Sequence, residues 1–358
     1  MIQCAARLAL LLSAPALLSA ADRWRISFFH DKPRETFDIA DFQCPAAGRC
    51  IAVGALEHDE KFSPHAVITA DSGAHWTSVA ISEIPVSLFF LNADTAWMVA
   101  EKGIWQSHDG GQNWKKLSPE RELQRVYFLD ENRGFAVGDE QKILQTTNGG
   151  LKWTAVGSLQ GLTSQPAENA FSWIFFPSPT HGIAIGEIEP SNASRVPAWL
   201  EPKRHHSRWL LLGRTTDAGV SWKFSRLQRD DDLVNVGVVK QALWFFFQPA
   251  GAEGQSEIAR CDWDKDALVP LLSDSQAIIA DSARSGETTF VAAISRQGRL
   301  MDVPIPGKLR VFSGPDFDRM APMDVDYRAV AMRAHFAVTS DGNAFLATDT
   351  GMILKLTH

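Results

Sequence analysis

The sequence predicts an all-β chain folded as a seven-bladed β-propeller with four-stranded antiparallel blades, and three observations support this fold class. An eight-residue pattern, Ser or Thr, x, Asp or Asn, x, Gly, x, x, Trp, occurs four times. Two of the three intervals between its tryptophans are 38 and 39 residues, which is the length of a four-stranded blade. A second element, two short apolar strands joined by a turn, occurs seven times, once for each blade.

The chain begins with a predicted signal peptide, residues 1–21. Arg7 precedes an apolar run that ends in small residues near Ala20 and Ala21, as secretory leaders do. We expect residues 22–358 to form a single propeller domain. No later stretch approaches about 18 uninterrupted apolar residues, the length that a membrane span needs. The sequence therefore predicts a soluble protein without a transmembrane segment, exported to the periplasm or secreted.

Charge and cysteine content limit the partners and the compartment. The chain has 35 basic and 42 acidic residues and a formal net charge of −7, which does not favour a nucleic-acid partner. Of its four cysteines, Cys4 lies in the leader. Cys44 and Cys50 are close enough in sequence to form a disulfide in an oxidising compartment. Cys261 is flanked by strand-like residues, so we expect it to be a buried apolar side chain.

The four copies of the repeated pattern are predicted to be hairpin turns with a structural role. Their sequences are TADSGAHW, SHDGGQNW, TTNGGLKW and TTDAGVSW. The hydroxyl and the Asp or Asn side chain can bond backbone amides of the turn, and the glycine permits positive φ. The tryptophan can pack back between strands while its indole N–H reaches a carbonyl. The residues assigned these roles are Thr69, Asp71, Gly73, Trp76, Ser107, Asp109, Gly111, Trp114, Thr146, Asn148, Gly150, Trp153, Thr215, Asp217, Gly219 and Trp222.

The strand–turn–strand elements begin near residues 50, 96, 134, 182, 242, 288 and 343, each with an apolar strand that ends in a small-residue turn. The longer interval between Trp153 and Trp222 indicates one blade with a polar insertion loop at about 187–208. The last unit ends at MILKLTH, before any box or fourth strand. We therefore expect residues 23–29 to complete the seventh blade and close the ring, with Trp24 at the position of a box tryptophan. Blade boundaries after residue 225 are less well defined, and six or eight blades also fit the pattern.

The repeated pattern resembles the Asp-box, also called the BNR repeat. In that family the boxes are structural turns at the blade periphery, and they are neither catalytic carboxylates nor calcium ligands. FQCPAAGRCIAVG followed by VITADSGAHWTSV further resembles the first blade of exported BNR-like proteins, which share their repeat with photosystem II assembly factors of the plant and cyanobacterial type. The resemblance implies a non-enzymatic scaffold that binds other proteins, such as an assembly or stability factor for an envelope complex.

The alternative is a carbohydrate-active enzyme or a sugar-binding propeller, because Asp-boxes also occur in sialidases and some endoglucanases. Such enzymes use two spaced carboxylates or, in sialidases, an arginine cluster with a tyrosine nucleophile. The two tyrosines, Tyr127 and Tyr327, lie in no context that marks a nucleophile, and the acidic run 230–232 is typical of a solvated loop. We predict no catalytic residues. Converging acids or arginines on the central face would favour sugar chemistry, whereas an apolar or Arg-rich rim would favour protein recognition.

The insertion carries the predicted binding feature, a basic cluster in an otherwise acidic protein. Loops on a rigid scaffold often carry binding function, so we expect the cluster to contact an acidic protein partner or an anionic membrane surface. A solvated loop without a partner is the alternative. The two histidines of the cluster are adjacent and cannot easily face one ion from a strand, so no metal or cofactor is predicted, and the chain is expected to be a monomer. The cluster comprises Trp199, Lys203, Arg204, His205, His206, Arg208 and Trp209.

Overall fold

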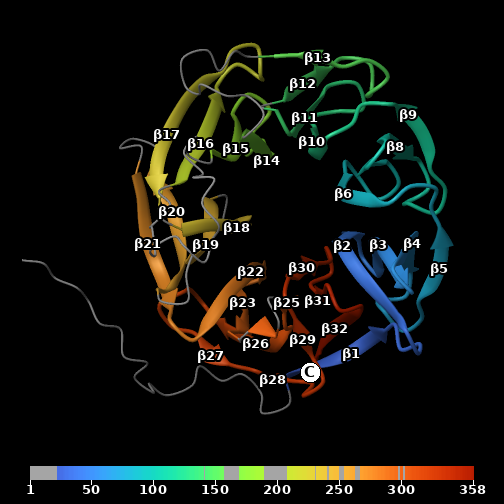
Figure 1. Ribbon diagram of the computed structural model, residues 1–358, viewed down its shortest axis with the longest axis vertical. Helices are drawn as coiled ribbons and strands as arrows, with labels where there is room; N and C mark the ends of the chain where they lie inside the picture. Colours follow the sequence, from blue (N-terminus) through green and yellow to red (C-terminus); the bar gives the residue numbers. More distant parts are fainter. Residues whose placement is uncertain are drawn as a thin grey trace, which may run out of the picture.

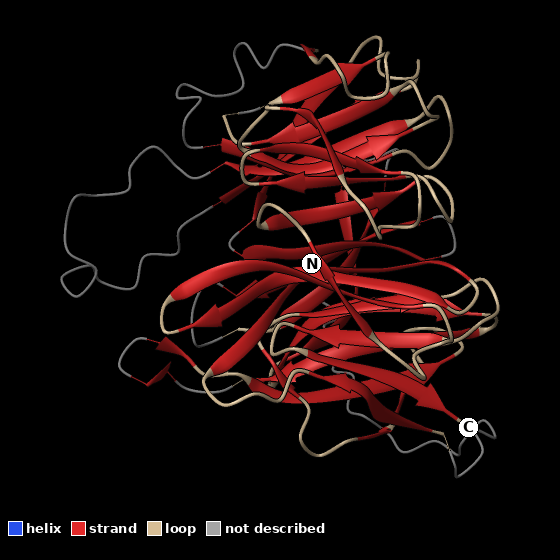
Figure 2. Ribbon diagram, turned by 90° about the vertical axis from the view of Figure 1, so that its right-hand side faces the viewer, coloured by secondary structure: helices blue, strands red, loops and turns tan. Residues whose placement is uncertain are grey.

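The described part of the chain forms a closed ring of antiparallel blades around a central axis (Figure 1). The structure is a computed structural model. It describes residues 22–140, 142–156, 169–188, 208–229, 231–239, 242–249, 254–262, 267–296, 299–300 and 303–358. Seen from the side, these residues are strands joined by turns (Figure 2). The predicted seven-bladed propeller of four-stranded blades is confirmed.

Blades 1 to 4 each contain four consecutive strands, ordered from the centre of the ring outward (Figure 1). The strands of these blades are β2 (Glu35–Ala46), β3 (Arg49–His58), β4 (Lys61–Thr69) and β5 (Thr77–Ala80); β6 (Pro85–Phe90), β7 (Ala96–Ala100), β8 (Gly103–Ser107) and β9 (Lys115–Ser118); β10 (Leu123–Phe128), β11 (Gly134–Gly138), β12 (Ile143–Thr146) and β13 (Thr154–Ala155); β14 (Asn169–Phe175), β15 (Gly182–Ile188), β16 (Arg208–Thr215) and β17 (Lys223–Arg229).

Blades 5 to 7 follow the same plan, with short additional strands in the last two. Their main strands are β18 (Asp231–Val239), β19 (Ala242–Pro249), β20 (Ser256–Asp262) and β21 (Ala267–Asp274); β22 (Ala277–Ser285), β23 (Thr288–Ser295), β26 (Gly307–Gly314) and β27 (Ala321–Pro322); β30 (Ala334–Val338), β31 (Ala344–Thr348), β32 (Met352–Thr357) and β1 (Arg23–Phe29). The additional strands are β24 (Arg299–Leu300), β25 (Val303–Pro304), β28 (Asp324–Val325) and β29 (Val330–Ala331).

The seven predicted strand–turn–strand elements are the seven second strands together with the turn that follows each. One detail of the prediction was wrong: the small residue does not always end the strand. Gly54 lies inside β3 and Gly186 inside β15. A Cβ at Gly54 would be 1.9 Å from the carbonyl oxygen of Asp38 on the neighbouring strand, so glycine there permits close contact between strands rather than a turn.

The core lies between the blades, which explains why their strands are apolar on both faces. In β19, Phe245 and Phe247 pack toward blade 4 with Ile185 and Leu212, whereas Phe246 packs toward blade 6 with Val291. All three phenylalanines are at most 1% exposed. A strand covered on both sides has no polar face to alternate with.

The four boxes are the turns between third and fourth strands, and the same hydrogen bonds recur in each. The Ser or Thr oxygen accepts a hydrogen bond from the glycine N–H four residues later, at 2.8–3.0 Å. Oδ1 of the Asp or Asn accepts the backbone N–H four residues later, at 2.9 Å in every box. The glycine φ angles are +80°, +88°, +96° and +85°, a region that glycine occupies without strain.

Each box is also tied to the hairpin between the first and second strands of its own blade. The residue before the box glycine donates its N–H to a carbonyl oxygen of that hairpin. The two kinds of hairpin therefore lie side by side at one end of the ring. The donor and acceptor pairs are Ser72 with Gly48, Gly110 with Asp94, Gly149 with Asn132, and Ala218 with Thr180.

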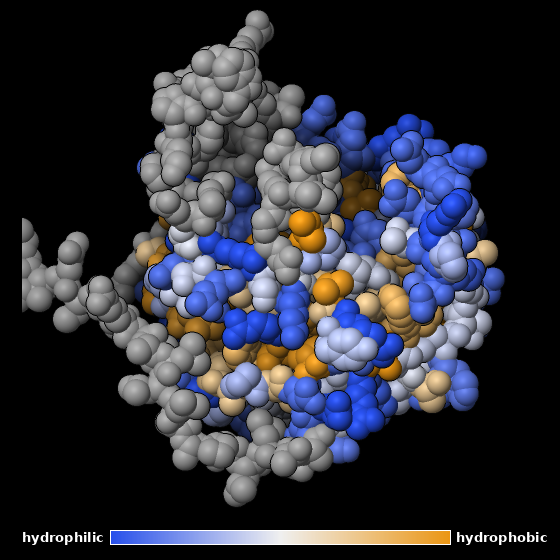
Figure 3. Space-filling view, turned by 60° about the horizontal axis from the view of Figure 1, so that its bottom comes forward, coloured by the Kyte–Doolittle hydropathy of each residue, from blue (hydrophilic) through white to orange (hydrophobic). Residues whose placement is uncertain are grey.

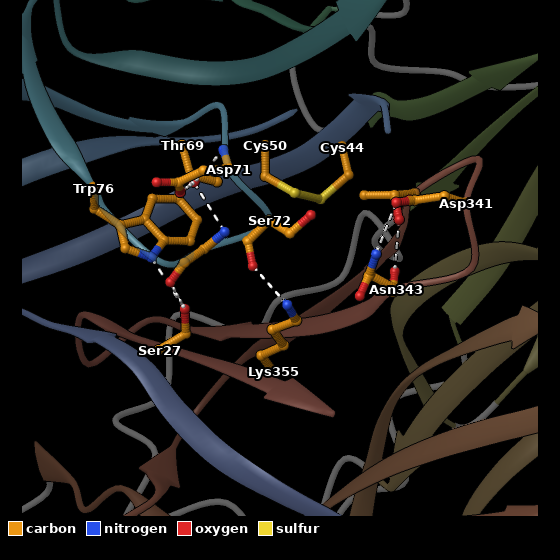
Figure 4. The surroundings of a disulfide bond; sticks show 12 residues. Ser27, Cys44, Cys50, Thr69, Asp71, Ser72, Trp76, Asp341, Asn343 and Lys355 are labelled. Carbon is orange, nitrogen blue, oxygen red and sulfur yellow. Dashed lines mark hydrogen bonds between the residues drawn. A yellow bond between two sulfur atoms is a disulfide. The ribbon is translucent and has the colours of Figure 1, made fainter. Parts of the chain in front are cut away.

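The N-terminal strand closes the ring as predicted. β1 pairs antiparallel with β32, from Arg23 opposite Thr357 to Phe29 opposite Met352. Lys355 of β32 donates a hydrogen bond to the carbonyl oxygen of Ser72 at 2.8 Å, which joins blade 7 to the first box (Figure 4). In the same view, a disulfide joins Cys44 and Cys50.

Trp24 of β1 packs as the box tryptophans do. It is 0% exposed and lies against Phe290 of blade 6 and Phe336 of blade 7. Trp76 of the first box likewise contacts a phenylalanine of the preceding blade and one of its own first strand. The box indoles of Trp76, Trp153 and Trp222 donate to Ser27 Oγ, Gly150 O and Gly219 O.

Candidate functional site

A β-bulge interrupts the innermost strand of blades 1 to 6 at the same place. The bulges fall before Asp41, Ser87, Arg125, Trp173, Asn235 and Asp281. In blade 7, His335 takes the equivalent position, because the N–H after it bonds Asp281 as the N–H after Ser87 bonds Asp41. Bulges redirect side chains, and here they place one residue per blade around the central axis. We call these seven residues the bulge ring.

Two carboxylates of the bulge ring hold neighbouring blades together. Asp41 accepts the N–H of Phe42 at 2.7 Å and, through its other oxygen, the N–H of Leu88 in blade 2 at 2.8 Å. Asp281 accepts the N–H of Ser282 at 2.8 Å and the N–H of Phe336 in blade 7 at 2.8 Å. Both oxygens of each acid are therefore engaged by backbone donors.

Ser87 and Asn235 make the same kind of inter-blade contact. Ser87 donates to the carbonyl oxygen of Gln124 in blade 3 at 2.8 Å. Asn235 Nδ2 donates to Asp281 Oδ1 at 3.0 Å and to the carbonyl oxygen of Ala280 at 3.2 Å. Four of the seven ring residues thus have a structural task, which is to bond the next blade.

Arg125, Trp173 and His335 are the three ring residues whose side chains make no hydrogen bond to a neighbouring blade among the described residues. Arg125 forms a long ion pair with Asp41, in which Nη1 and Oδ2 are 3.9 Å apart, a distance too long for a hydrogen bond. The guanidinium lies 5.9 Å from the centre of the Trp173 ring. The Trp173 indole N–H is buried and has no hydrogen-bond partner among the described residues.

These side chains line a central cavity of about 380 Å³, within the range of small-ligand pockets. Six ring residues contribute to it, together with the strand segments that follow them: Gln43 and Cys44, residues 236–238, and Ala337 and Val338. These segments run toward the first hairpins of their blades, so the cavity extends toward the end of the ring that carries the boxes. Val238, on that side, is 42% exposed.

Burial changes the protonation of two ring residues. Desolvation raises the pKa of Asp281 to about 7, against the N–H bonds from Phe336 and Ser282 and the charge of Arg125, which lower it. Desolvation also lowers the pKa of His335, with Asp41 raising it and Arg125 lowering it. At neutral pH the imidazole is therefore uncharged, and one of its nitrogens carries a proton that can be donated.

Replacing Asp281 by asparagine is expected to lower the free energy of unfolding by about 2 kcal/mol, the cost of an unsatisfied buried donor. The amide has one oxygen, so its NH2 group would face either the N–H of Phe336 or the N–H of Ser282. Denaturant unfolding checks this value. Ser282→Ala is the matched control, because Ser282 Oγ is buried with no partner among the described residues, and it should unfold like the wild type. Equal loss in both variants would contradict the role of Asp281 in bonding blade 6 to blade 7.

The structure shows the surroundings of the two tyrosines and the acidic run that were weighed for the enzyme alternative. The hydroxyl of Tyr127 donates to the carbonyl oxygen of Phe176 at 3.0 Å, and burial raises its pKa. Tyr327 is 80% exposed and does not line the cavity. The solvated loop predicted at 230–232 was wrong for two of its residues: Asp231 and Asp232 begin β18. Asp231 forms an ion pair with Arg229, with Oδ2 of Asp231 and Nη2 of Arg229 2.6 Å apart.

The predicted basic cluster lies mostly outside the described residues, and its binding role stays a prediction. The residues outside are Trp199, Lys203, Arg204, His205 and His206. Arg208 is the first residue of β16. Trp209 packs under the guanidinium of Arg226, whose Cζ is 4.6 Å from the ring centre, and joins the core between blades 3 and 4. Cys261 is buried between blades 4 and 5.

Apolar side chains are also visible between polar ones on the side of the ring formed by blades 6 and 7 (Figure 3). Ile305, Tyr327 and Met332 are 41%, 80% and 47% exposed. Single exposed apolar residues are normal on protein surfaces, and they converge on no cavity. The central cavity is the better candidate site.

Sequence reasoning did not find the cavity residues. Arg125, Trp173 and His335 lie in LQRVYF, FSWIF and AHFAV, three inner strands with no shared motif. Their common feature is structural, since each takes the ring position. Aligning the seven first strands with one another, so that one polar or aromatic residue of each falls at the same position, is the signal that could have found them.

The fold and cavity define a β-propeller with a polar central pocket. No known family model matches the sequence, and no curated protein matches it. Among solved structures, the chain is similar to "YCF48 bound to D1 peptide", with a TM-score of 0.61 and 16% identity over 97% of this chain and 100% of that one. It is also similar to YCF48 from Cyanidioschyzon merolae, with a TM-score of 0.59 and 16% identity over 93% of this chain and 98% of that one.

Other similar structures include a WD40 propeller domain and a protease. The WD40 propeller domain of Doa1 has a TM-score of 0.55 and 8% identity over 94% of this chain and 97% of that one. The tricorn protease has a TM-score of 0.54 and 8% identity over 91% of this chain and 34% of that one. The resemblance to YCF48-type assembly factors is thus confirmed as a shared fold, and at these identities the fold alone is shown. The described residues include no helix long and apolar enough for a membrane span.

Proposed function

We propose that the protein is an exported, non-enzymatic scaffold that binds another protein at the central cavity and serves as an assembly or stability factor for an envelope complex. One observation carries this proposal. The two acids of the cavity are engaged by backbone amides, whereas Arg125, Trp173 and His335 line the space and make no side-chain hydrogen bond to a neighbouring blade among the described residues. A rigid ring with hydrogen-bond donors at its centre is suited to recognition.

The shared fold supports the same proposal, because one YCF48 structure is of the protein bound to a D1 peptide. Export follows from the apolar leader at residues 1–21. Amino-terminal sequencing of the protein from an envelope fraction should begin near residue 21 or 22, and an intact Met1 would contradict cleavage.

Affinity capture tests the binding proposal. The bait is the chain from residue 22, the prey is host envelope extract, and mass spectrometry identifies what is retained. We expect a saturable protein partner that the double variant Arg125→Gln, Trp173→Phe retains at least tenfold less, since both changes remove donors from the cavity. Arg319→Gln is the matched control: its side chain is 69% exposed and pairs with Asp316 outside the cavity. Equal capture by all three proteins would place the binding surface elsewhere.

A charge-reversal variant of the predicted basic cluster is tested in the same capture experiment. Charge reversal at Lys203, Arg204 and Arg208 removes the partner if the insertion contacts it, and leaves capture unchanged if the cavity acts alone. The two sets of variants therefore assign the surface.

A sugar-directed function is the second candidate, because the pKa of Asp281 is raised to about 7, which suits a general acid. Against it, both oxygens of Asp281 already accept N–H bonds. Incubation with a panel of polysaccharides should release no reducing sugar. Release that Asp281→Asn abolishes in a folded protein would favour the enzyme.

A further inference from the structure

We propose that the central cavity binds a carboxylate group through the Arg125 guanidinium and the Trp173 indole N–H. This inference rests on the proposed binding function and specifies the chemistry that the cavity recognises. Its starting point is the balance of donors and acceptors among the residues that line the cavity.

The two acids that line the cavity already accept hydrogen bonds. Asp41 accepts two backbone N–H groups. Asp281 accepts two backbone N–H groups and the amide of Asn235. A ligand that offers mainly donors, such as a cation, would have to displace bonds that hold adjacent blades together. The cavity is therefore poorly suited to a cationic group.

The Trp173 indole and the Arg125 guanidinium are hydrogen-bond donors only. The Trp173 N–H is buried and makes no hydrogen bond to the described residues, which is costly unless a ligand or water accepts it. The Arg125 side chain is 33% exposed and forms a long ion pair with Asp41, in which Nη1 and Oδ2 are 3.9 Å apart, so the other N–H groups of its guanidinium can bind a second carboxylate. His335 lines the same space, and so does Ser282, whose buried Oγ has no partner among the described residues.

Geometry and charge favour a carboxylate over a larger anion. The Arg125 guanidinium lies over the Trp173 ring, with Cζ 5.9 Å from the ring centre. We therefore propose that one carboxylate, whose oxygens accept hydrogen bonds at about 2.9 Å, contacts both side chains. A guanidinium binds a planar carboxylate in a two-point fork. The cavity offers one such cation beside the Asp41 carboxylate, which matches a single negative charge better than the double charge of a phosphate.

The carboxylate could be the end of a polypeptide or an acidic side chain, and two peptide probes separate these sources. The first is acetyl-Gly-Gly-Gly with a free carboxyl terminus, and the second is acetyl-glutamate N-methylamide. Acetyl-Gly-Gly-Gly-amide lacks any carboxylate, and inorganic phosphate is the comparison anion. Binding to the chain from residue 22 is measured by calorimetry and by the shift of the Trp173 indole N–H resonance, assigned with Trp173→Phe.

We expect at least one carboxylate probe to bind and to shift the Trp173 resonance, while the amide does not. Arg125→Gln should weaken that binding tenfold or more, as the loss of a charge-assisted hydrogen bond does. Arg319→Gln should bind like the wild type. Should Arg125→Gln fold poorly, Arg125→Lys keeps the charge without the two-point fork, and a weaker affinity in that variant supports the same conclusion.

Binding of neither carboxylate probe, binding of phosphate alone, or binding that Arg125→Gln and Arg125→Lys leave unchanged would overturn the inference. The proposed function fails differently. A protein partner captured through Arg125 while no carboxylate probe binds would leave the scaffold standing and reject the carboxylate. Carboxylate binding without any captured protein would support the carboxylate site and reject the protein-binding scaffold.

Discussion

Replacing Trp24 by alanine is expected to lower the free energy of unfolding by about 4 kcal/mol, the typical cost of truncating a large buried aromatic residue. The indole is 0% exposed and lies between Phe290 and Phe336. It also belongs to β1, the strand that joins the ends of the chain. The lost contacts therefore weaken the closure of the ring as well as the core between blades 6 and 7.

Denaturant unfolding of the chain from residue 22 measures this loss. Trp24→Phe should lose about half as much, because it retains an aromatic ring between the two phenylalanines. Tyr327→Ala is the control for removing an aromatic side chain outside the core, since Tyr327 is 80% exposed, and it should change the stability little. A Trp24→Ala protein as stable as Tyr327→Ala would show that β1 does not hold the ring.

The fold was predictable because its repeats require the same residue types at the same positions, even where the rest of the sequence differs. The boxes need a hydroxyl, a short polar side chain and glycine at fixed positions, since each makes the same hydrogen bond in all four boxes. The closure was predictable because the last unit lacked a fourth strand and residues 23–29 had no other partner. These features follow from local backbone geometry, which short sequence patterns record.

The cavity was not predictable by the same means. A bulge is set by the pairing of two strands, and no residue type in the strand announces it. Arg125, Trp173 and His335 share a position but are three different residue types. Which ring residues bond the next blade depends on the residues that face them from that blade. The solvated loop predicted for the acidic run at 230–232 was wrong at Asp231 and Asp232 for a related reason. The charge of the run indicated exposure to solvent, but Arg229 forms ion pairs with Asp231 and Glu257 at the start of a strand.

The carboxylate inference gives the bulge ring two separate tasks. Asp41, Ser87, Asn235 and Asp281 bond adjacent blades, and this keeps the spacing of the remaining three side chains constant. A rigid setting lowers the cost of ordering a binding site. Substitutions of the four residues that bond adjacent blades should therefore mainly reduce stability, whereas substitutions of Arg125 and Trp173 should mainly reduce ligand binding.

Among alanine replacements of the box glycines, Gly219→Ala should be the most destabilising, lowering the free energy of unfolding by about 3 kcal/mol. Gly219 has a φ of +85°, where a side chain costs about 1–2 kcal/mol. A Cβ there would also lie 2.2 Å from Cζ of Phe135, a ring that is 0% exposed. Displacing it adds about 1–3 kcal/mol of overpacking strain.

Gly150→Ala is the matched control for Gly219→Ala, because it makes the same change in the same turn. Gly150 has a φ of +96°, but its Cβ would meet no atom closer than 3.5 Å. It should therefore cost only the backbone term. The difference between the two variants in denaturant unfolding isolates the contact with Phe135, through which the fourth box packs against blade 3. Equal losses would mean that the contact between the fourth box and Phe135 does not help to hold blades 3 and 4 together.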